Sequence, residues 1–134
     1  MAIAIYPEPG MVFLCDYTGY VRPEIIKARP VVVVSPRRHR MVLADVTTLV
    51  VPLSKLPPQV AQPWHIAIPP GKYAAIDACW AKGDLVSHVA LARLSFLRHR
   101  RRLVVPVLDR RDLQSVRNAV ANALGLLTSA RRVG

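Results

Sequence analysis

The distribution of proline constrains this chain more than any other sequence feature. All twelve prolines among the 134 residues lie at or before Pro106. Proline lacks a backbone N–H and interrupts helices. The first four fifths of the chain therefore favour strands and loops, and a long helix is expected only in the part that follows.

Apolar runs between the prolines predict short strands. The run Pro30–Ser35 (PVVVVS) has four consecutive β-branched residues, which is typical of a buried central strand. Pro52 lies near the end of another run, so we expect a sheet edge or a bulge at that point. The stretch 85–97 fits either a strand or a short helix. The expected strands cover residues 11–17, 30–35, 47–54, 65–68, 74–80 and 103–108.

The C-terminal part changes to a helical period. Apolar residues recur there at steps of three and four, the pattern of an amphipathic helix. Asp109 is the expected N-cap, with Asp112 three residues later as in a capping box. We therefore predict a mainly β (α+β) fold, a small barrel or curled sheet with a C-terminal helix, forming one domain over residues 1–134. The helical stripe consists of Leu113, Val116, Val120, Leu124 and Leu127.

Length and composition narrow the class of protein. A chain of 14.8 kDa with 52% hydrophobic and 20% charged residues is large enough for one core and argues against disorder. No apolar run approaches the ~20 residues that span a bilayer, and the start MAIAIYPEPG lacks the basic region of a signal peptide. Two cysteines, Cys15 and Cys79, are too few for a disulfide framework. We expect reduced, buried thiols in a cytoplasmic protein.

The charge balance indicates a polyanionic partner. Lys and Arg total 19 against 8 Asp and Glu, which gives a net charge of +11, and 15 of the cations are Arg. The planar guanidinium matches phosphate geometry. Nucleic acid is therefore a more probable partner than a membrane surface.

Several catalytic patterns are absent from the sequence. The four histidines are scattered and do not pair with the cysteines, so no metal site is expected. The six glycines form neither a phosphate-binding loop nor a nucleophile elbow. No cofactor is expected, and the common nucleotide-dependent enzymes and hydrolases are disfavoured.

The stretch 23–35 (PEIIKARPVVVVS) is the most informative part of the sequence. Glu24 and Arg29 lie in or beside a loop that leads into the most apolar strand, and a rigid strand holds charges at its mouth in place. The alternative is that Glu24 and Lys27 are solvated loop charges and that Arg29 only begins a strand.

The order of these residues resembles the PemK/MazF family of toxin ribonucleases. The resemblance rests on Gly10-Met11-Val12, on Glu24, on residues 29–36 (RPVVVVSP) and on residues 49–54 (LVVPLS). The stretch 78–94 is similar to one branch of that family. The family pattern is a Gly before the first strand, a loop Glu, an Arg-Pro entering a Val-rich strand that ends in Ser, and a strand ending in Pro-x-Thr/Ser.

The resemblance implies an SH3-like barrel that forms a homodimer. It also implies a metal-independent, sequence-selective endoribonuclease that cuts single-stranded RNA by attack of the 2′-OH on the scissile phosphate. A cognate antitoxin protein that occupies the RNA groove is the implied partner.

The resemblance assigns three catalytic residues. Arg29 occupies the position of the family's catalytic Arg and would bind the scissile phosphate. Ser54 occupies a position that is usually Thr, and its hydroxyl would donate to a phosphoryl oxygen. Glu24 matches a loop Glu and would act as the base or orient Arg29.

Aromatic and basic residues near this stretch are the predicted RNA contacts. Tyr17 and Tyr20 flank the loop and are either platforms for unpaired bases or packing residues. Trp80 is either a stacking platform or a core residue. The basic turns 37–40 and 98–102 would add phosphate contacts or remain solvated. The cations predicted to contact RNA are Lys27, Arg37, Arg38, Arg40 and Lys82.

Two segments depart from the family pattern, and two other functions remain open. Arg22-Pro23-Glu24-Ile25 replaces the usual Gly-Ser-Glu-Gln, and Ala78-Cys79-Trp80 replaces an Asp-Gln segment. The first alternative function is a non-enzymatic gyrase poison similar to the CcdB family. The second is an RNA-binding module that does not cleave.

Overall fold

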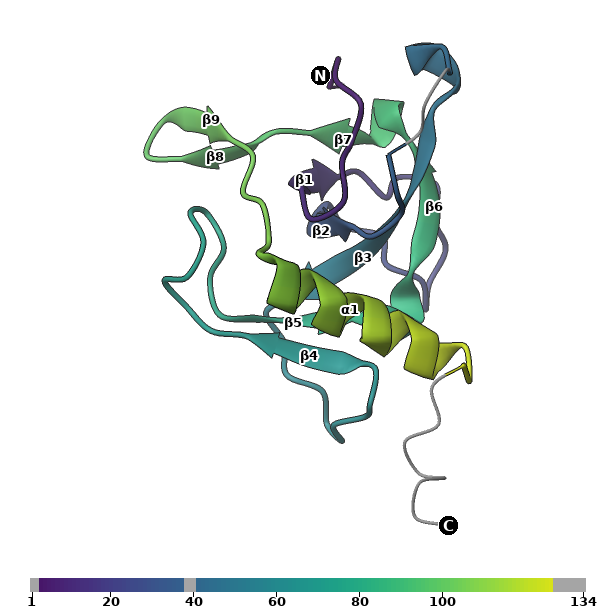
Figure 1. Ribbon diagram of the computed structural model, residues 1–134, viewed down its shortest axis with the longest axis vertical. Coiled ribbons are helices and arrows are strands. Elements are labelled where there is room, and N and C mark those ends of the chain that lie inside the picture. Colours follow the sequence, from purple (N-terminus) through teal and green to yellow (C-terminus); the bar gives the residue numbers. More distant parts are fainter. Residues whose placement is uncertain (1–2, 38–40, 127–134) are drawn as a thin grey trace.

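The computed structural model describes residues 3–37 and 41–126 and shows a curled sheet, a small hairpin and one α-helix (Figure 1). The sheet has the order β4-β5-β3-β2-β1-β7, with β6 also paired to β3. The predicted mainly β class with a C-terminal helix is confirmed. Among the described residues no ladder joins the outer strands β4 and β7, so the sheet curls without closing. Its strands are β1 (Val12–Cys15), β2 (Arg29–Val33), β3 (Thr47–Ser54), β4 (His65–Ile68), β5 (Cys79–Lys82), β6 (Ser87–Ala90) and β7 (Leu94–Ser95).

The valine run forms the centre of the sheet. Strand β2 lies antiparallel between β1 and β3. Alternate side chains of a strand point to opposite faces, and both faces of β2 are covered. Val31 and Val33 pack in one core cluster, while Val32 and Val34 pack in the other. The run is continuously apolar because neither face of this strand meets water.

Strand β3 changes partner at Pro52. Its residues 47–50 pair with β6, whereas Leu53 and Ser54 pair with β5. Pro52 lies between the two ladders, where its missing N–H leaves no hydrogen bond unmade. The expectation of an edge or a bulge is thus corrected: β3 is an interior strand, and Pro52 marks the change of partner.

Two predicted strands differ in extent from those observed. Residues 74–78 form turns, with Ala75 at φ 64°, and β5 begins only at Cys79. Strand β9 (Arg102–Val104) pairs with β8 (Leu97–His99), and the segment after it runs back to β1, where Val12 N donates to the Pro106 carbonyl. The ambiguous stretch 85–97 contains both short strands and 3-10 turns, which are η2 (Gly83–Leu85) and η3 (Leu91–Arg93); a third, η1 (Leu43–Asp45), precedes β3.

Helix α1 (Arg110–Ala123) packs against the sheet through the predicted stripe. Val116 is fully buried, and Leu113 and Val120 pack against the same core cluster. A Cβ added to Gly83 would lie 2.7 Å from the carbonyl carbon of Ala119, so this glycine permits the close approach of helix and η2. The sheet covers the stripe from Leu113 to Val120, whereas Leu124, just past the helix, is 63% exposed. The predicted Leu127 lies outside the described residues.

The predicted N-cap is confirmed, and a tyrosine completes it. The Asp109 side chain accepts a hydrogen bond from the Asp112 amide at 2.7 Å. The Tyr73 hydroxyl accepts from the Asp109 amide at 3.0 Å and donates to the Asp112 carboxylate at 2.6 Å. In a capping box the third residue bonds back to the cap directly; here the Tyr73 hydroxyl makes that connection.

No helix within the described residues is both long and apolar enough to cross a membrane.

Candidate functional site

Arg29, Ser54 and Trp80 lie in one row across three strands. Val31 of β2 pairs with Pro52 of β3, and continuing this register by two residues places Arg29 opposite Ser54. Ser54 in turn pairs with Trp80 of β5. Residues directly opposite each other in an antiparallel pair point to the same face. The pairing thus places the Ser54 hydroxyl and the Trp80 indole side by side, and the extrapolated register places the Arg29 side chain on the same face of the sheet.

Two prolines explain why the sheet opens at this row. Pro30 and Pro52 lack the N–H that a ladder needs, and the regular β2–β3 pairing stops at the pair Val31–Pro52. Beyond that pair the strands keep their direction because the valine core anchors them. The row is thus held by strands at a place where the pairing between β2 and β3 ends, while β2 remains paired with β1 and β3 with β5.

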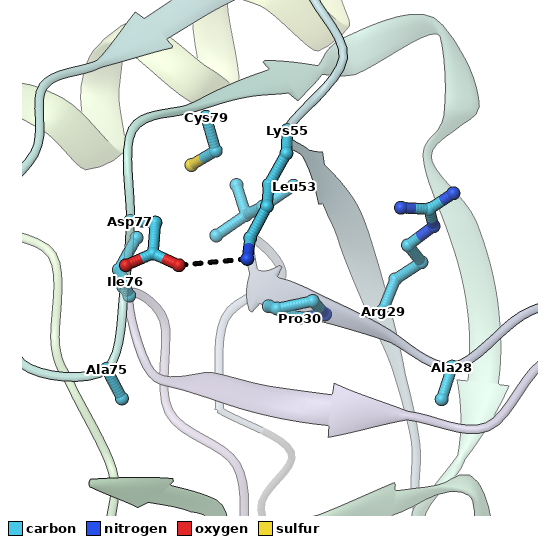
Figure 2. Close-up of a pocket in the computed structure, with 9 residues that line it drawn as sticks. All are labelled: Ala28, Arg29, Pro30, Leu53, Lys55, Ala75, Ile76, Asp77 and Cys79. Carbon is cyan, nitrogen blue, oxygen red and sulfur yellow. Dashed lines mark ion pairs between the residues drawn. The ribbon is translucent and has the colours of Figure 1, made fainter.

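Arg29 is available for a ligand. Its side chain is half-buried, and it has no hydrogen bond or ion pair within residues 3–37 and 41–126. Arg29 lines one side of the cavity drawn in Figure 2, and Ile76 and Asp77 line the opposite side. An unpaired guanidinium on a rigid strand is a suitable phosphate ligand.

Ser54 is more enclosed than Arg29. It is 8% exposed, and its Oγ accepts a hydrogen bond from the Leu56 amide at 3.3 Å. Because the oxygen accepts that bond, the hydroxyl hydrogen remains free to be donated elsewhere. The geometry is compatible with donation to a group placed beside Arg29.

Glu24 lies in the loop between β1 and β2. One of its carboxylate oxygens accepts from the Val21 amide at 2.7 Å, so the side chain stabilises its own loop. No ion pair with Arg29 is formed. Glu24 and Arg29 nevertheless line the same open hollow of about 640 Å³, together with Arg22 and Lys27. Three cations against one carboxylate make this hollow attractive to a phosphate chain.

Trp80 and Lys82 are both half-buried residues of β5, two positions apart, and therefore share the face that carries Ser54. The predicted contacts Trp80 and Lys82 thus lie beside the predicted catalytic residues, on a neighbouring strand.

The two predicted tyrosine platforms have different environments. Tyr17 is only 2% exposed and meets Tyr20 edge-on, with ring centroids 5.0 Å apart. Tyr20 is half-buried, and the Arg93 guanidinium lies 5.2 Å from its ring centroid. Tyr17 is thus a packing residue in this state, and only Tyr20 retains an accessible surface.

The predicted basic turns do not join this site. Arg37 follows β2 at the end opposite to Arg29, and its guanidinium lies 5.7 Å from the Tyr6 ring centroid. Arg38 and Arg40 lie outside the described residues. The second basic turn is the tip of the β8–β9 hairpin, where Arg100 and Arg101 both have positive φ. Figure 1 shows this hairpin on the side of the molecule away from β6.

Sequence reasoning missed a cavity next to the row. It has a volume of about 350 Å³ and is lined by Arg29 itself as well as by Pro30, Leu53 and Cys79 (Figure 2). The Lys55 ammonium spans it to reach the Asp77 carboxylate at 2.9 Å. Lys55 directly follows Ser54 in the sequence. This adjacency is the sequence signal that could have indicated a residue of the cavity wall.

The cysteines do not contribute a reactive group. Cys15 and Cys79 are buried and unpaired, as predicted, and burial raises the pKa of each thiol to about 11. Both thiols are therefore protonated at neutral pH and are poor nucleophiles. Among residues 3–37 and 41–126, no three His, Cys, Asp or Glu side chains gather in a way that could hold a metal ion.

Comparison with known proteins places this geometry in context. The family profile described as PemK-like, MazF-like toxin of type II toxin–antitoxin system matches residues 8–124. No curated protein matches the chain by sequence.

Several solved structures share the fold. A crystal structure of MazF from Deinococcus radiodurans is 16% identical with a TM-score of 0.69, and the match covers 90% of this chain and 98% of that one. An endoribonuclease in complex with its cognate antitoxin, from Mycobacterial species, is 22% identical with a TM-score of 0.60, covering 91% and 98%. An endoribonuclease from Mycobacterial species is 19% identical with a TM-score of 0.63, covering 92% and 96%.

Proposed function

Because this chain belongs to the PemK-like, MazF-like toxins of type II toxin–antitoxin systems, we propose that it is an endoribonuclease that cuts single-stranded RNA at selected sequences without a metal ion. The observation that carries the proposal is the row of Arg29, Ser54 and Trp80 on one face of β2, β3 and β5. Solved structures with this fold are described as endoribonucleases, and the net charge of +11 suits a polyanionic substrate.

This chemistry needs a proton acceptor for the 2′-OH, a proton donor to the leaving oxygen, and groups that stabilise the charge on the phosphoryl oxygens. The 2′-OH attacks the adjacent phosphorus, the bond to the 5′ oxygen of the next nucleotide breaks, and charge develops on the phosphoryl oxygens. The 2′-OH loses a proton, and the leaving oxygen gains one. A metal ion is unnecessary if protein groups stabilise the charge and transfer the protons.

Arg29 and Ser54 stabilise the phosphoryl charge in this proposal. The unpaired guanidinium of Arg29 binds the scissile phosphate. The Ser54 hydroxyl accepts from the Leu56 amide and donates its own hydrogen to a phosphoryl oxygen. Glu24 is the proton acceptor, since its carboxylate lines the same hollow as Arg29.

Substrate binding relies on cations and aromatic surfaces around the hollow. Arg22 and Lys27 line it together with Arg29, and Trp80 and Lys82 extend the same face along β5. Binding through such cations weakens as salt concentration rises, because counterions compete for the phosphates.

The proposed assembly is a cytoplasmic homodimer whose RNA site is blocked by a cognate antitoxin protein. The antitoxin part is supported by solved structures of this fold with an antitoxin. An acidic segment of the antitoxin would suit the cationic hollow beside Arg29.

The test is cleavage of a long single-stranded RNA by purified protein with EDTA present. We expect cleavage by the natural protein and a loss of about 10²–10³-fold in Arg29→Ala, the usual effect of removing one group that stabilises the developing charge. Arg110→Ala is the matched control, because it removes the same charge from the exposed start of α1. Binding without cleavage would favour the non-cleaving RNA-binding module. Intact RNA together with inhibited DNA supercoiling would favour the gyrase poison.

A further inference from the structure

An ion pair spans the cavity beside Arg29. The Lys55 ammonium, just past the end of β3, lies 2.9 Å from the Asp77 carboxylate on the segment before β5 (Figure 2). Apart from Arg29, the rest of the lining is apolar or neutral, because burial keeps the Cys79 thiol protonated. The cavity wall therefore carries two cations and one carboxylate, and the carboxylate is paired with only one of the cations.

The cavity adjoins the hollow in which the RNA is proposed to bind. Arg29 lines both of them, and Lys55 directly follows Ser54 in the sequence. An RNA strand whose scissile phosphate is held by Arg29 and Ser54 therefore runs past the cavity. Its neighbouring phosphate lies within the range of a lysine side chain that starts at position 55.

The ion pair between Lys55 and Asp77 is weak enough to be exchanged. The two side chains are 74% and 73% exposed, and such pairs contribute little to stability because water and salt screen them. Neither side chain has another hydrogen bond or ion pair within residues 3–37 and 41–126. Lysine carries a compact charge on a flexible stem and needs no fixed geometry. The ammonium can therefore leave a carboxylate for a phosphate at little cost.

Two interpretations of this pair predict different behaviour. A purely structural pair would tie the end of β3 to the segment before β5, and the loss of either partner would affect stability alone. A pair that holds a substrate-binding lysine in the RNA-free protein makes the carboxylate a competitor of the RNA phosphate. Substitutions of the two partners then change the RNA affinity in opposite directions.

We propose that Lys55 is a phosphate-binding residue of the RNA site and that Asp77 occupies its ammonium until RNA displaces the carboxylate. The proposal rests on the RNA-binding part of the function proposed above and adds to it one ligand and one internal competitor. Asp77 lowers the RNA affinity because only the fraction of molecules with a free Lys55 is ready to bind.

Binding of an RNA that resists cleavage tests the proposal. A mixed-sequence RNA of twelve nucleotides, fully 2′-O-methylated, lacks the attacking hydroxyl. In fluorescence anisotropy we expect Lys55→Gln to weaken binding about fivefold. The slope of log affinity against log salt concentration should fall by about 0.7, the value for one phosphate contact to a single strand. Asp77→Asn should strengthen binding about threefold, since an exposed ion pair of ordinary strength keeps Lys55 paired most of the time.

The double variant Lys55→Gln/Asp77→Asn separates competition from simple repulsion. If Asp77 acts by occupying Lys55, its removal has no effect once Lys55 is absent, and the double variant binds like Lys55→Gln. If Asp77 only repels RNA through its charge, the threefold gain persists. The matched controls are Asp45→Asn in η1 and Arg110→Gln at the start of α1, which change the net charge equally at exposed positions. Each control should alter the affinity less than twofold.

The outcomes separate this inference from the proposed function. Unchanged binding in Lys55→Gln, unchanged or weaker binding in Asp77→Asn, or a gain that persists in the double variant would each overturn the inference, even if the natural protein cuts unmodified RNA. The expected set of affinities in a protein that cuts no RNA would support the inference and reject the nuclease. A natural protein that does not bind the oligomer would reject both.

Discussion

Just past the C-terminal end of β2, the polar groups around Ser35 are hydrogen-bonded to each other. At the N-terminal end of β2, the polar groups around Arg29 are not bonded to each other. The Ser35 and Thr48 hydroxyls are hydrogen-bonded at 2.8 Å, and Ser35 Oγ also accepts from the Leu49 amide at 3.1 Å. At the other end Arg29 has no partner among the described residues, and two prolines end the ladder. The same two strands thus have one end built for stability and one end left open for a ligand.

A pair of tyrosines repeats this difference. The Tyr73 hydroxyl donates to Asp112 and accepts from the Asp109 amide, which completes the cap of α1. The Tyr17 hydroxyl is buried and makes no hydrogen bond of full geometry, although the Ser87 and Cys15 side chains lie close enough to affect its pKa. Satisfied groups contribute to stability, whereas a buried hydroxyl without a full hydrogen bond costs free energy.

For the two serines at opposite ends of these strands, the larger expected effect is on catalysis at Ser54. Ser54→Ala should reduce RNA cleavage by about 10²-fold while changing the melting temperature little, because one donor to the phosphoryl charge is lost. Ser54→Thr keeps the hydroxyl and should restore most of the activity. Rates measured under single-turnover conditions would check this, and an Ala variant as active as the natural protein would remove Ser54 from the site.

The matched serine at the other end should show the reverse. Ser35 is 3% exposed, and Ser35→Ala would leave Thr48 and the Leu49 amide without their partner. We expect a loss of about 1–3 kcal/mol in the free energy of unfolding, with RNA cleavage unchanged at temperatures where the variant is folded. Urea denaturation measures the first quantity. A fall in cleavage as large as that of Ser54→Ala would contradict the contrast between the two ends.

The tyrosine pair predicts stability changes of opposite sign. Tyr73→Phe removes two hydrogen bonds at the helix cap and should cost about 1 kcal/mol. Tyr17→Phe removes an unsatisfied buried hydroxyl and should leave the protein equally stable or more stable. Thermal unfolding of both variants side by side checks the prediction, which fails if Tyr17→Phe is the more destabilised variant.

The smallest expected effect is the acid dependence of the helix cap. The hydrogen bond from the Asp112 amide, followed by the Lys72 ammonium, lowers the pKa of Asp109 below its ordinary value of 3.8. A lowered carboxyl pKa contributes stability that is complete above the ordinary value and is lost as the pH falls through the lowered one. Melting temperatures should therefore show a component that disappears at strongly acidic pH.

The control for the acid effect is Asp109→Asn. Asn can still cap the helix but does not titrate. The difference in melting temperature between the natural protein and this variant should shrink as the pH falls below 3.8. A difference that is constant with pH would show that the Asp109 charge does not contribute.

Local patterns were sufficient for most of the elements. The valine run predicted a central strand because both of its faces are buried, and the apolar spacing together with Asp109 predicted α1 and its cap. Prediction failed where a residue adopts a conformation that its type disfavours: Ala75, at positive φ, delays β5 to Cys79. It also failed at Pro52, because a change of strand partner leaves no trace in the local sequence.

For the site, the sequence alone determined which groups are present: a cationic chain, Arg29 before the valine strand and Ser54 at the end of another. Only the tertiary structure decided which of them meet. Strand register places Ser54 beside Trp80 and on the face that carries Arg29, and leaves Arg37 at the far end of β2. Tertiary packing buries Tyr17. The physical reason is that period and propensity act over a few residues, whereas register and burial depend on contacts between segments distant in the chain.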